Sequence, residues 1–379
     1  MSVPALLRRA WIAPLALVAC ACVQAHDDEA AAAKRLPQRI ALLASAQAAL
    51  QRGDANQALD DFERAAMMLH ASDAELGLIR AAMQDGQYRR ALAFCAHTAG
   101  EHTDDADGGA LYAWLLRIGG QGELATRVLA DTRTLAPGDV VAAAVDAAFV
   151  ANPPLATGVL LEPLHRMAPW PVMLDAQAPP PATARFAGNA VLVDDGAAAL
   201  TPLASIELAP RTRLWVRNGL GQTTEATLDR PDAALASRGL ARLRLRATLP
   251  AGASRLAAGR APFAGSPGYA AQFGPGSEPA WPALSQGFLG GPVGDSDVRR
   301  LGFASTSGAP VLDAKGALIG IVLASVNGQA TWLPLSALAP PPADANAGPA
   351  PRAQSLVAPD EIYESGLRRT LQVLVDPPR

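Results

Sequence analysis

Residues 301–322 read LGFASTSGAPVLDAKGALIGIV and decide the fold expected for the second half of the chain. A Ser-Gly-Ala-Pro turn leads into a short apolar run, and a polar Asp-Ala-Lys-Gly turn leads into a second one. Apolar runs joined by a short polar turn are typical of a β-hairpin. The pattern therefore predicts a turn, a strand, a hairpin and a second strand, with Ser307 at the first tight turn.

The same sequence pattern extends upstream, where short apolar runs alternate with Gly, Pro and Asp. Strands are predicted over 186–193, 198–206, 213–216, 222–228, 240–245 and 287–289. Many short strands at such spacing indicate an all-β barrel or sandwich.

The turn and hairpin resemble the nucleophile region of trypsin-like serine proteases, and of their bacterial HtrA-like branch in particular. In that family a Gly-Asn/Asp-Ser-Gly-Gly-Pro turn precedes a hairpin that ends in Gly-Ile. The matching residues are Ser305, Thr306, Ser307, Gly308, Ala309 and Pro310, followed by Ile319, Gly320 and Ile321. The resemblance implies a trypsin-like double barrel over 185–338. It also implies a C-terminal helix, which helical spacing of apolar residues places over 359–375.

In such proteases an imidazole takes the proton of the serine hydroxyl, and a carboxylate holds that imidazole in place. By the resemblance, Ser307 occupies the nucleophile position, Ala204 the histidine position and Gly239 the aspartate position. A shifted alignment offers Asp232 as the aspartate but still supplies no histidine. Ser305 and Ser307 would form the oxyanion turn, although the family has glycine where Ser305 stands. The resemblance thus implies the fold more strongly than the activity.

Three functions from different classes follow. The first is an exported, catalytically inactive trypsin-like protein that binds a protein or peptide. The second is a serine endopeptidase that uses an unconventional base, either His165 or Lys315. The third is an adaptor in which only the helical first half of the chain captures a partner.

That first half, residues 36–150, is rich in Ala and Leu with helical periodicity, which predicts an antiparallel helical array. Three glycines spaced 33 and 34 residues apart are each followed five residues later by an alanine. They are Gly53, Gly86 and Gly120, with Ala58, Ala91 and Ala125. The spacing resembles tetratricopeptide repeats, in which glycine closes the turn at positive φ and alanine lets the helices approach. This resemblance implies a peptide-binding groove or a module that packs on the next domain.

The N-terminus has the form of a bacterial export signal over 1–25, with two arginines before an apolar run. The segment fits two alternatives, cleavage after Ala25 and lipidation of Cys20 at a lipobox. The protein is therefore expected either in the periplasm or lipid-anchored at the outer membrane. Membrane contact is expected only through that anchor. Cys95 is the cysteine that remains in either case, and its apolar helical surroundings predict a buried thiol.

The remaining segments are a Pro-rich linker over 151–184 and a Pro- and Ala-rich loop over 339–358. The net charge is −3, and Lys and Arg are dispersed, which argues against nucleic-acid binding through phosphate contacts. No cofactor and no metal site are predicted. The acidic loop 103–109 lacks the ligand spacing of a calcium loop.

Overall fold

The computed structural model describes residues 29–376, except 104, 176, 207–211, 252–261, 277, 327–328 and 339–355. For 29–34 and 324–326 it describes the backbone alone. The predicted signal segment with Cys20, and most of the predicted loop 339–358, lie outside the described residues.

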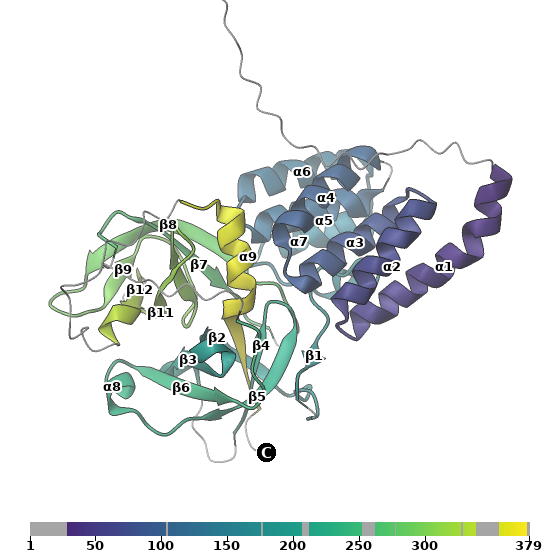
Figure 1. The fold of residues 1–379 in the computed structure, drawn as a ribbon. Coiled ribbons are helices and arrows are strands. Elements are labelled where there is room, and N and C mark those ends of the chain that lie inside the picture. Colours follow the sequence, from purple (N-terminus) through teal and green to yellow (C-terminus); the bar gives the residue numbers. More distant parts are fainter. Residues whose placement is uncertain are drawn as a thin grey trace, which may run out of the picture.

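Seven α-helices fill the described residues from 29 to 148 and form an antiparallel array (Figure 1). They are α1 (Glu29–Gln51), α2 (Ala55–Met68), α3 (Ser72–Asp85), α4 (Tyr88–Glu101), α5 (Ala106–Ile118), α6 (Gly122–Leu135) and α7 (Val140–Ala148). The three repeated glycines adopt φ values of 78°, 80° and 86°, as predicted for the turns between helices. The three alanines that follow them are fully buried. Within the described residues, no helix has the length and apolar character needed to cross a bilayer.

The first of two six-stranded antiparallel barrels contains β2 (Arg185–Val193), β3 (Ala198–Pro202), β4 (Arg213–Asn218), β5 (Gln222–Leu228), β6 (Leu240–Leu245) and β13 (Thr370–Asp376). Its strands follow the order β2-β3-β6-β5-β4-β13, and β13 pairs with both β4 and β2. The last strand of the chain therefore closes the first barrel. A short strand, β1 (Val172–Met173), adds to β5 in parallel.

The second barrel contains β7 (Pro267–Gln272), β8 (Ala283–Pro292), β9 (Arg299–Leu301), β10 (Pro310–Asp313), β11 (Leu318–Val326) and β12 (Gln329–Pro334). The predicted turn-strand-hairpin-strand pattern corresponds to β10 and β11, which pair antiparallel. A helical array followed along the chain by two barrels matches the fold class expected from the sequence.

The C-terminal helix is shorter than predicted. Helix α9 (Pro359–Arg369) ends six residues before Val375, and the chain continues directly as β13. Leu371 and Leu374 happen to continue the helical spacing of apolar residues in α9. They belong to the segment TLQVLVD, in which apolar residues also recur at every second position, as in a strand. Leu371, Val373 and Val375 enter the core of the first barrel, whereas Leu374 packs with Trp215. Alternation and branched side chains favour the strand.

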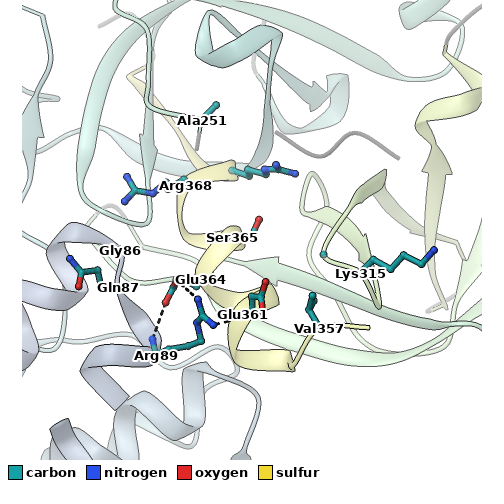
Figure 2. Close-up of a pocket in the computed structure, with 12 residues that line it drawn as sticks. Gly86, Gln87, Arg89, Ala251, Lys315, Val357, Glu361, Glu364, Ser365 and Arg368 are labelled. Carbon is teal, nitrogen blue, oxygen red and sulfur yellow. Dashed lines mark hydrogen bonds and ion pairs between the residues drawn. The ribbon is translucent and has the colours of Figure 1, made fainter. Parts of the chain in front are cut away.

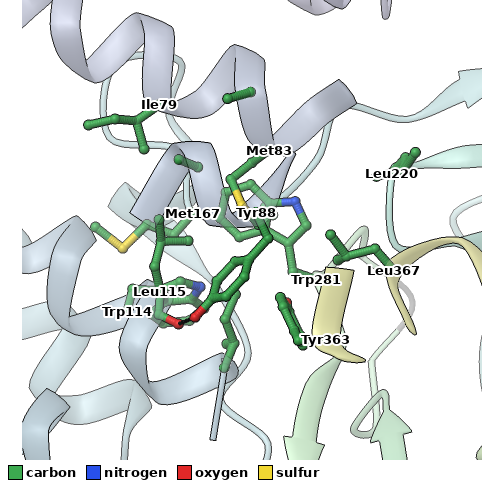
Figure 3. Packing of buried hydrophobic residues seen from close by; sticks show 14 of the residues in the cluster. Ile79, Met83, Tyr88, Trp114, Leu115, Met167, Leu220, Trp281, Tyr363 and Leu367 are labelled. Atoms are coloured by element: carbon green, nitrogen blue, oxygen red, sulfur yellow. Dashed lines mark hydrogen bonds between the residues drawn. The ribbon is translucent and has the colours of Figure 1, made fainter. Parts of the chain in front are cut away.

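Helix α9 lies between the helical array and the second barrel, and a single apolar core runs through all three (Figure 1). Tyr88 of α4 and Tyr363 of α9 meet edge to face with ring centroids 4.4 Å apart (Figure 3). Both hydroxyls are satisfied, by the carbonyls of Leu115 and Pro282 respectively. The array thus packs firmly on the barrels.

Candidate functional site

Ser307 lies in the tight turn that enters β10, as its sequence pattern predicts. Gly308 has a φ of 86°, and its N–H donates to the carbonyl of Val322 at 2.8 Å. A Cβ at this position would overlap the carbonyl oxygen of Asn189 on β2. The glycine therefore combines the left-handed conformation with a close approach to the first barrel.

The positions that the resemblance assigns to a catalytic triad lie close together. β3 ends at Pro202, which borders Gly308, and the next residues form a 3₁₀ turn, Leu203–Ser205, that contains Ala204. The Leu203 N–H donates to the carbonyl of Gly239 at 2.8 Å. Gly188 faces both the Ser205 side chain and the Ser307 carbonyl. The chain thus brings the three segments to one end of the barrel interface.

The residues at the positions assigned to the histidine and the aspartate carry no titratable side chain. Ala204 presents a methyl group and Gly239 only hydrogen. The Ser307 Oγ is shielded from solvent and has no hydrogen-bond partner among the described residues. A serine nucleophile requires a base within hydrogen-bond reach, and no described residue makes a hydrogen bond to the Ser307 Oγ.

A buried network of amides and hydroxyls holds the turn instead. The fully buried Asn189 donates through Nδ2 to Thr306 Oγ1 at 2.8 Å and accepts at Oδ1 from the Phe273 N–H at 2.8 Å. The Thr201 hydroxyl donates to the Asn189 carbonyl at 2.9 Å. One asparagine side chain therefore connects the first barrel, the Ser307 turn and the second barrel.

Gln272 of β7 completes the network from the second barrel. Its Oε1 accepts from the Thr306 N–H at 2.5 Å and from the Ser305 hydroxyl at 3.0 Å. Its Nε2 donates to Ser285 Oγ at 2.8 Å. Residues of the predicted oxyanion turn are thus hydrogen-bonded to the side-chain amide oxygen of Gln272. Nothing in the local sequence marks Asn189 or Gln272, because the groups of Ser305 and Thr306 that they bond lie 33 to 117 residues away.

The two alternative bases have other surroundings. His165 lies in the segment 151–184, and its Nδ1 is 2.6 Å from Oδ2 of Asp107 on α5 of the helical array. Burial raises the pKa of Asp107, and the nearby His165 opposes this shift. Lys315 occupies the β10–β11 hairpin turn, half-buried, at the rim of a cavity that α9 also lines.

That cavity, about 350 Å³ in volume, lies where the helical array, α9 and the second barrel meet (Figure 2). Four basic side chains and two acidic ones line it: Arg89, Lys315, Arg368, Arg369, Glu361 and Glu364. Glu364 accepts from the Arg89 backbone N–H at 3.0 Å and from its guanidinium at 3.4 Å. The cavity walls therefore carry an excess of positive charge.

No protein-family model matches the chain, and no curated protein matches it.

Proposed function

We propose that this protein is an exported, catalytically inactive member of the trypsin-like double-barrel architecture that acts by binding a protein or peptide. The convergence of Ala204, Gly239 and a partnerless Ser307 hydroxyl supports the proposal. The fold has kept the layout of a protease site without its base. Loss of triad function lowers turnover by roughly 10⁴ or more.

Binding is assigned to the cavity at the junction of the helical array and the barrels. Its basic excess suits an acidic side chain or the terminal carboxylate of a peptide. Arg89 is already paired with Glu364, and the Arg368 guanidinium donates to the Asp85 carbonyl. Lys315 lies at the rim with no salt bridge to a described residue and is the group we assign to the ligand.

The rival function is a serine endopeptidase with His165 or Lys315 as the base. His165 is already paired with Asp107, and Lys315 lies in the hairpin turn beside α9. The adaptor function has less support, because the helical array shares its core with the barrels and with α9. If the adaptor function holds, deletion of 36–150 abolishes partner capture and deletion of the barrels does not.

A turnover assay tests the inactive state. Purified full chain and its Ser307→Ala variant are incubated with casein and with a mixed peptide library, and released peptides are quantified. Both proteins should release the same background amount. Cleavage by the wild type that disappears in Ser307→Ala would establish the rival.

A peptide-display selection tests the binding site. The full chain should enrich peptides with an acidic residue or an acidic C-terminus, and Lys315→Glu should lose this enrichment. Lys315→Arg keeps the charge and is the matched control, which should enrich the same peptides. Equal enrichment on all three proteins would place binding outside the cavity.

The proposal that the protein is exported, and its alternative of a lipid anchor, rest on the sequence of the first 25 residues. Lipidation predicts incorporation of a labelled fatty acid into the wild type and into Cys22→Ala, and none into Cys20→Ala. If none of the three incorporates label and the protein is found free in the periplasm, cleavage after Ala25 is the correct interpretation.

A further inference from the structure

Three of the five histidines of the chain gather around one glutamate in the helical array. His70 lies in the connection between α2 and α3, and Glu75 lies in the first turn of α3. His97 belongs to the last turns of α4, and His102 caps that helix. Residues from two helices and one connection therefore converge on a single point.

All three imidazoles point the same nitrogen at the carboxylate. His70 Nε2 lies 2.6 Å from Glu75 Oε1, and His97 Nε2 lies 3.7 Å from the same oxygen. His102 Nε2 lies 3.5 Å from Glu75 Oε2. Single ligand atoms of His70, Glu75 and His102 all lie within 4.8 Å of one another.

The cluster lacks a compensating cation among the described residues. Glu75 is only 4% exposed, and its recorded ion-pair partners are these three histidines. A buried carboxylate is costly unless a positive charge balances it, and neutral imidazole does not supply one. His102 Nε2 is shielded from solvent and has no hydrogen-bond partner in the described structure. Its nitrogen is placed to act as a ligand.

We propose that His70, Glu75 and His102 bind one divalent transition-metal ion of the zinc type, with His97 beside them. Ligands at about 2.0–2.1 Å in a tetrahedron lie about 3.3 Å apart, and the ligand atoms of the cluster, all within 4.8 Å of one another, can reach that spacing by small side-chain adjustments. Imidazole nitrogens favour zinc-type ions, whereas calcium and magnesium prefer oxygen ligands. This proposal is independent of the function assigned to the barrels.

The surroundings also fit a metal centre. The Thr98 hydroxyl donates to Glu75 Oε2 at 2.7 Å and orients the carboxylate, as outer partners of metal ligands do. The side chains of His70 and His97 are 52% and 44% exposed, so an ion can enter from solvent. A bound ion would fasten the α2–α3 connection to the end of α4 and stabilise the array.

Zinc titration of the full chain, stripped with a chelator, tests the site by calorimetry. We expect one ion per chain and a higher melting temperature in its presence. Thr98→Val should weaken zinc binding about 10- to 100-fold, and His70→Ala or His102→Ala should weaken it more. His165→Ala removes a histidine outside the cluster and should bind zinc as the wild type does.

Cobalt provides a second readout, because four-coordinate cobalt shows strong visible absorption that the wild type should display and His102→Ala should lose. The His70 side chain is 52% exposed, so His70→Ala should fold and keeps the test valid if His102→Ala unfolds. Equal zinc affinity in the wild type and in His70→Ala would overturn the proposal. Stabilisation by acid with no effect of zinc would also overturn it, since the cluster would then bind only protons.

Discussion

Asn189 is the residue on which the junction of the two barrels depends. It is fully buried, and its amide and carbonyl groups bond Thr306, Phe273 and Thr201. Removing one partner from a buried hydrogen bond leaves the other unsatisfied, which costs about 1–3 kcal/mol for each group. A side chain with several such bonds therefore contributes more to stability than Ser307, whose hydroxyl has no partner in the described structure.

Asn189→Ala should lower the free energy of unfolding by about 2–4 kcal/mol, because the Phe273 N–H loses its acceptor and the Thr306 hydroxyl oxygen loses one donor. Urea unfolding measures the change. Thr201→Val removes a single hydroxyl from the same network and should cost about 1 kcal/mol. If Asn189→Ala unfolds at the wild-type urea concentration, the network does not hold the barrels together.

Gly308→Ala should destabilise more than Gly138→Ala, although both glycines have a φ of 86°. At Gly138 an added Cβ meets no atom within 4 Å, so only the left-handed backbone contributes, about 1–2 kcal/mol. At Gly308 overlap with the Asn189 carbonyl should add about 1–3 kcal/mol. Thermal unfolding of the two variants measures the difference.

Ser307→Ala, measured in the same series, should not lower the free energy of unfolding and should raise it by up to about 1 kcal/mol, because the buried hydroxyl makes no bond to a described residue. A large change for Ser307→Ala together with a neutral Gly308→Ala would contradict a purely architectural turn.

Cys95 should be unreactive in the folded protein. Burial raises the pKa of its thiol above the usual range, with Arg80 opposing the shift. The folded state therefore favours the protonated thiol, so stability is complete below about pH 8.5 and falls as the pH rises through the pKa of the unfolded thiol. A thiol reagent added to Cys20→Ser/Cys22→Ser protein at pH 8.5 should react only after urea is added. Rapid reaction without urea would show that Cys95 is accessible.

Strand β13 is the element that makes the first barrel depend on the end of the chain. It lies between β2 and β4, and it contributes Leu371, Val373 and Val375 to the barrel core. Without it, both neighbours expose a strand edge, and the barrel opens. The first barrel cannot close until residues 370–376 have been synthesised.

Removal of residues 370–379 should abolish the near-ultraviolet signal of the buried Trp215, which packs against Leu374. A peptide of residues 370–379 added in excess should restore part of it, because the strand adds by backbone pairing. Removal of 377–379 alone keeps all of β13 and is the control. A truncated protein with a native spectrum would show that β13 is dispensable.

In the whole molecule, the sequence predicts local structure well and long-range contacts poorly. Helical periodicity and the glycine turns are confirmed, and the predicted strands reappear within a few residues as β2 to β6 and β8. β7 is missed because Pro267-Gly268 begins it and apolar alternation is weak. The end of α9 is misplaced because one spacing fits both a helix and a strand.

The sequence allowed us to expect Ala204, Gly239 and Ser307 near one another, because the resemblance assigns all three to one site. Asn189, Gln272 and the histidine cluster have no such motif, since their partners come from distant parts of the chain. Residues that meet only after folding leave no periodic or short-range signal. The cavity beside Lys315 is of the same kind, because it forms where three parts of the fold meet.

The proposed function requires that the double barrel carries Ser307 without a base that activates it. A fluorophosphonate labels only a serine that a base has activated. Intact-mass measurement of the full chain after incubation with such a reagent should show no adduct, in the wild type and in Ser307→Ala alike. An adduct of one reagent on the wild type that is absent from Ser307→Ala would contradict the proposed function.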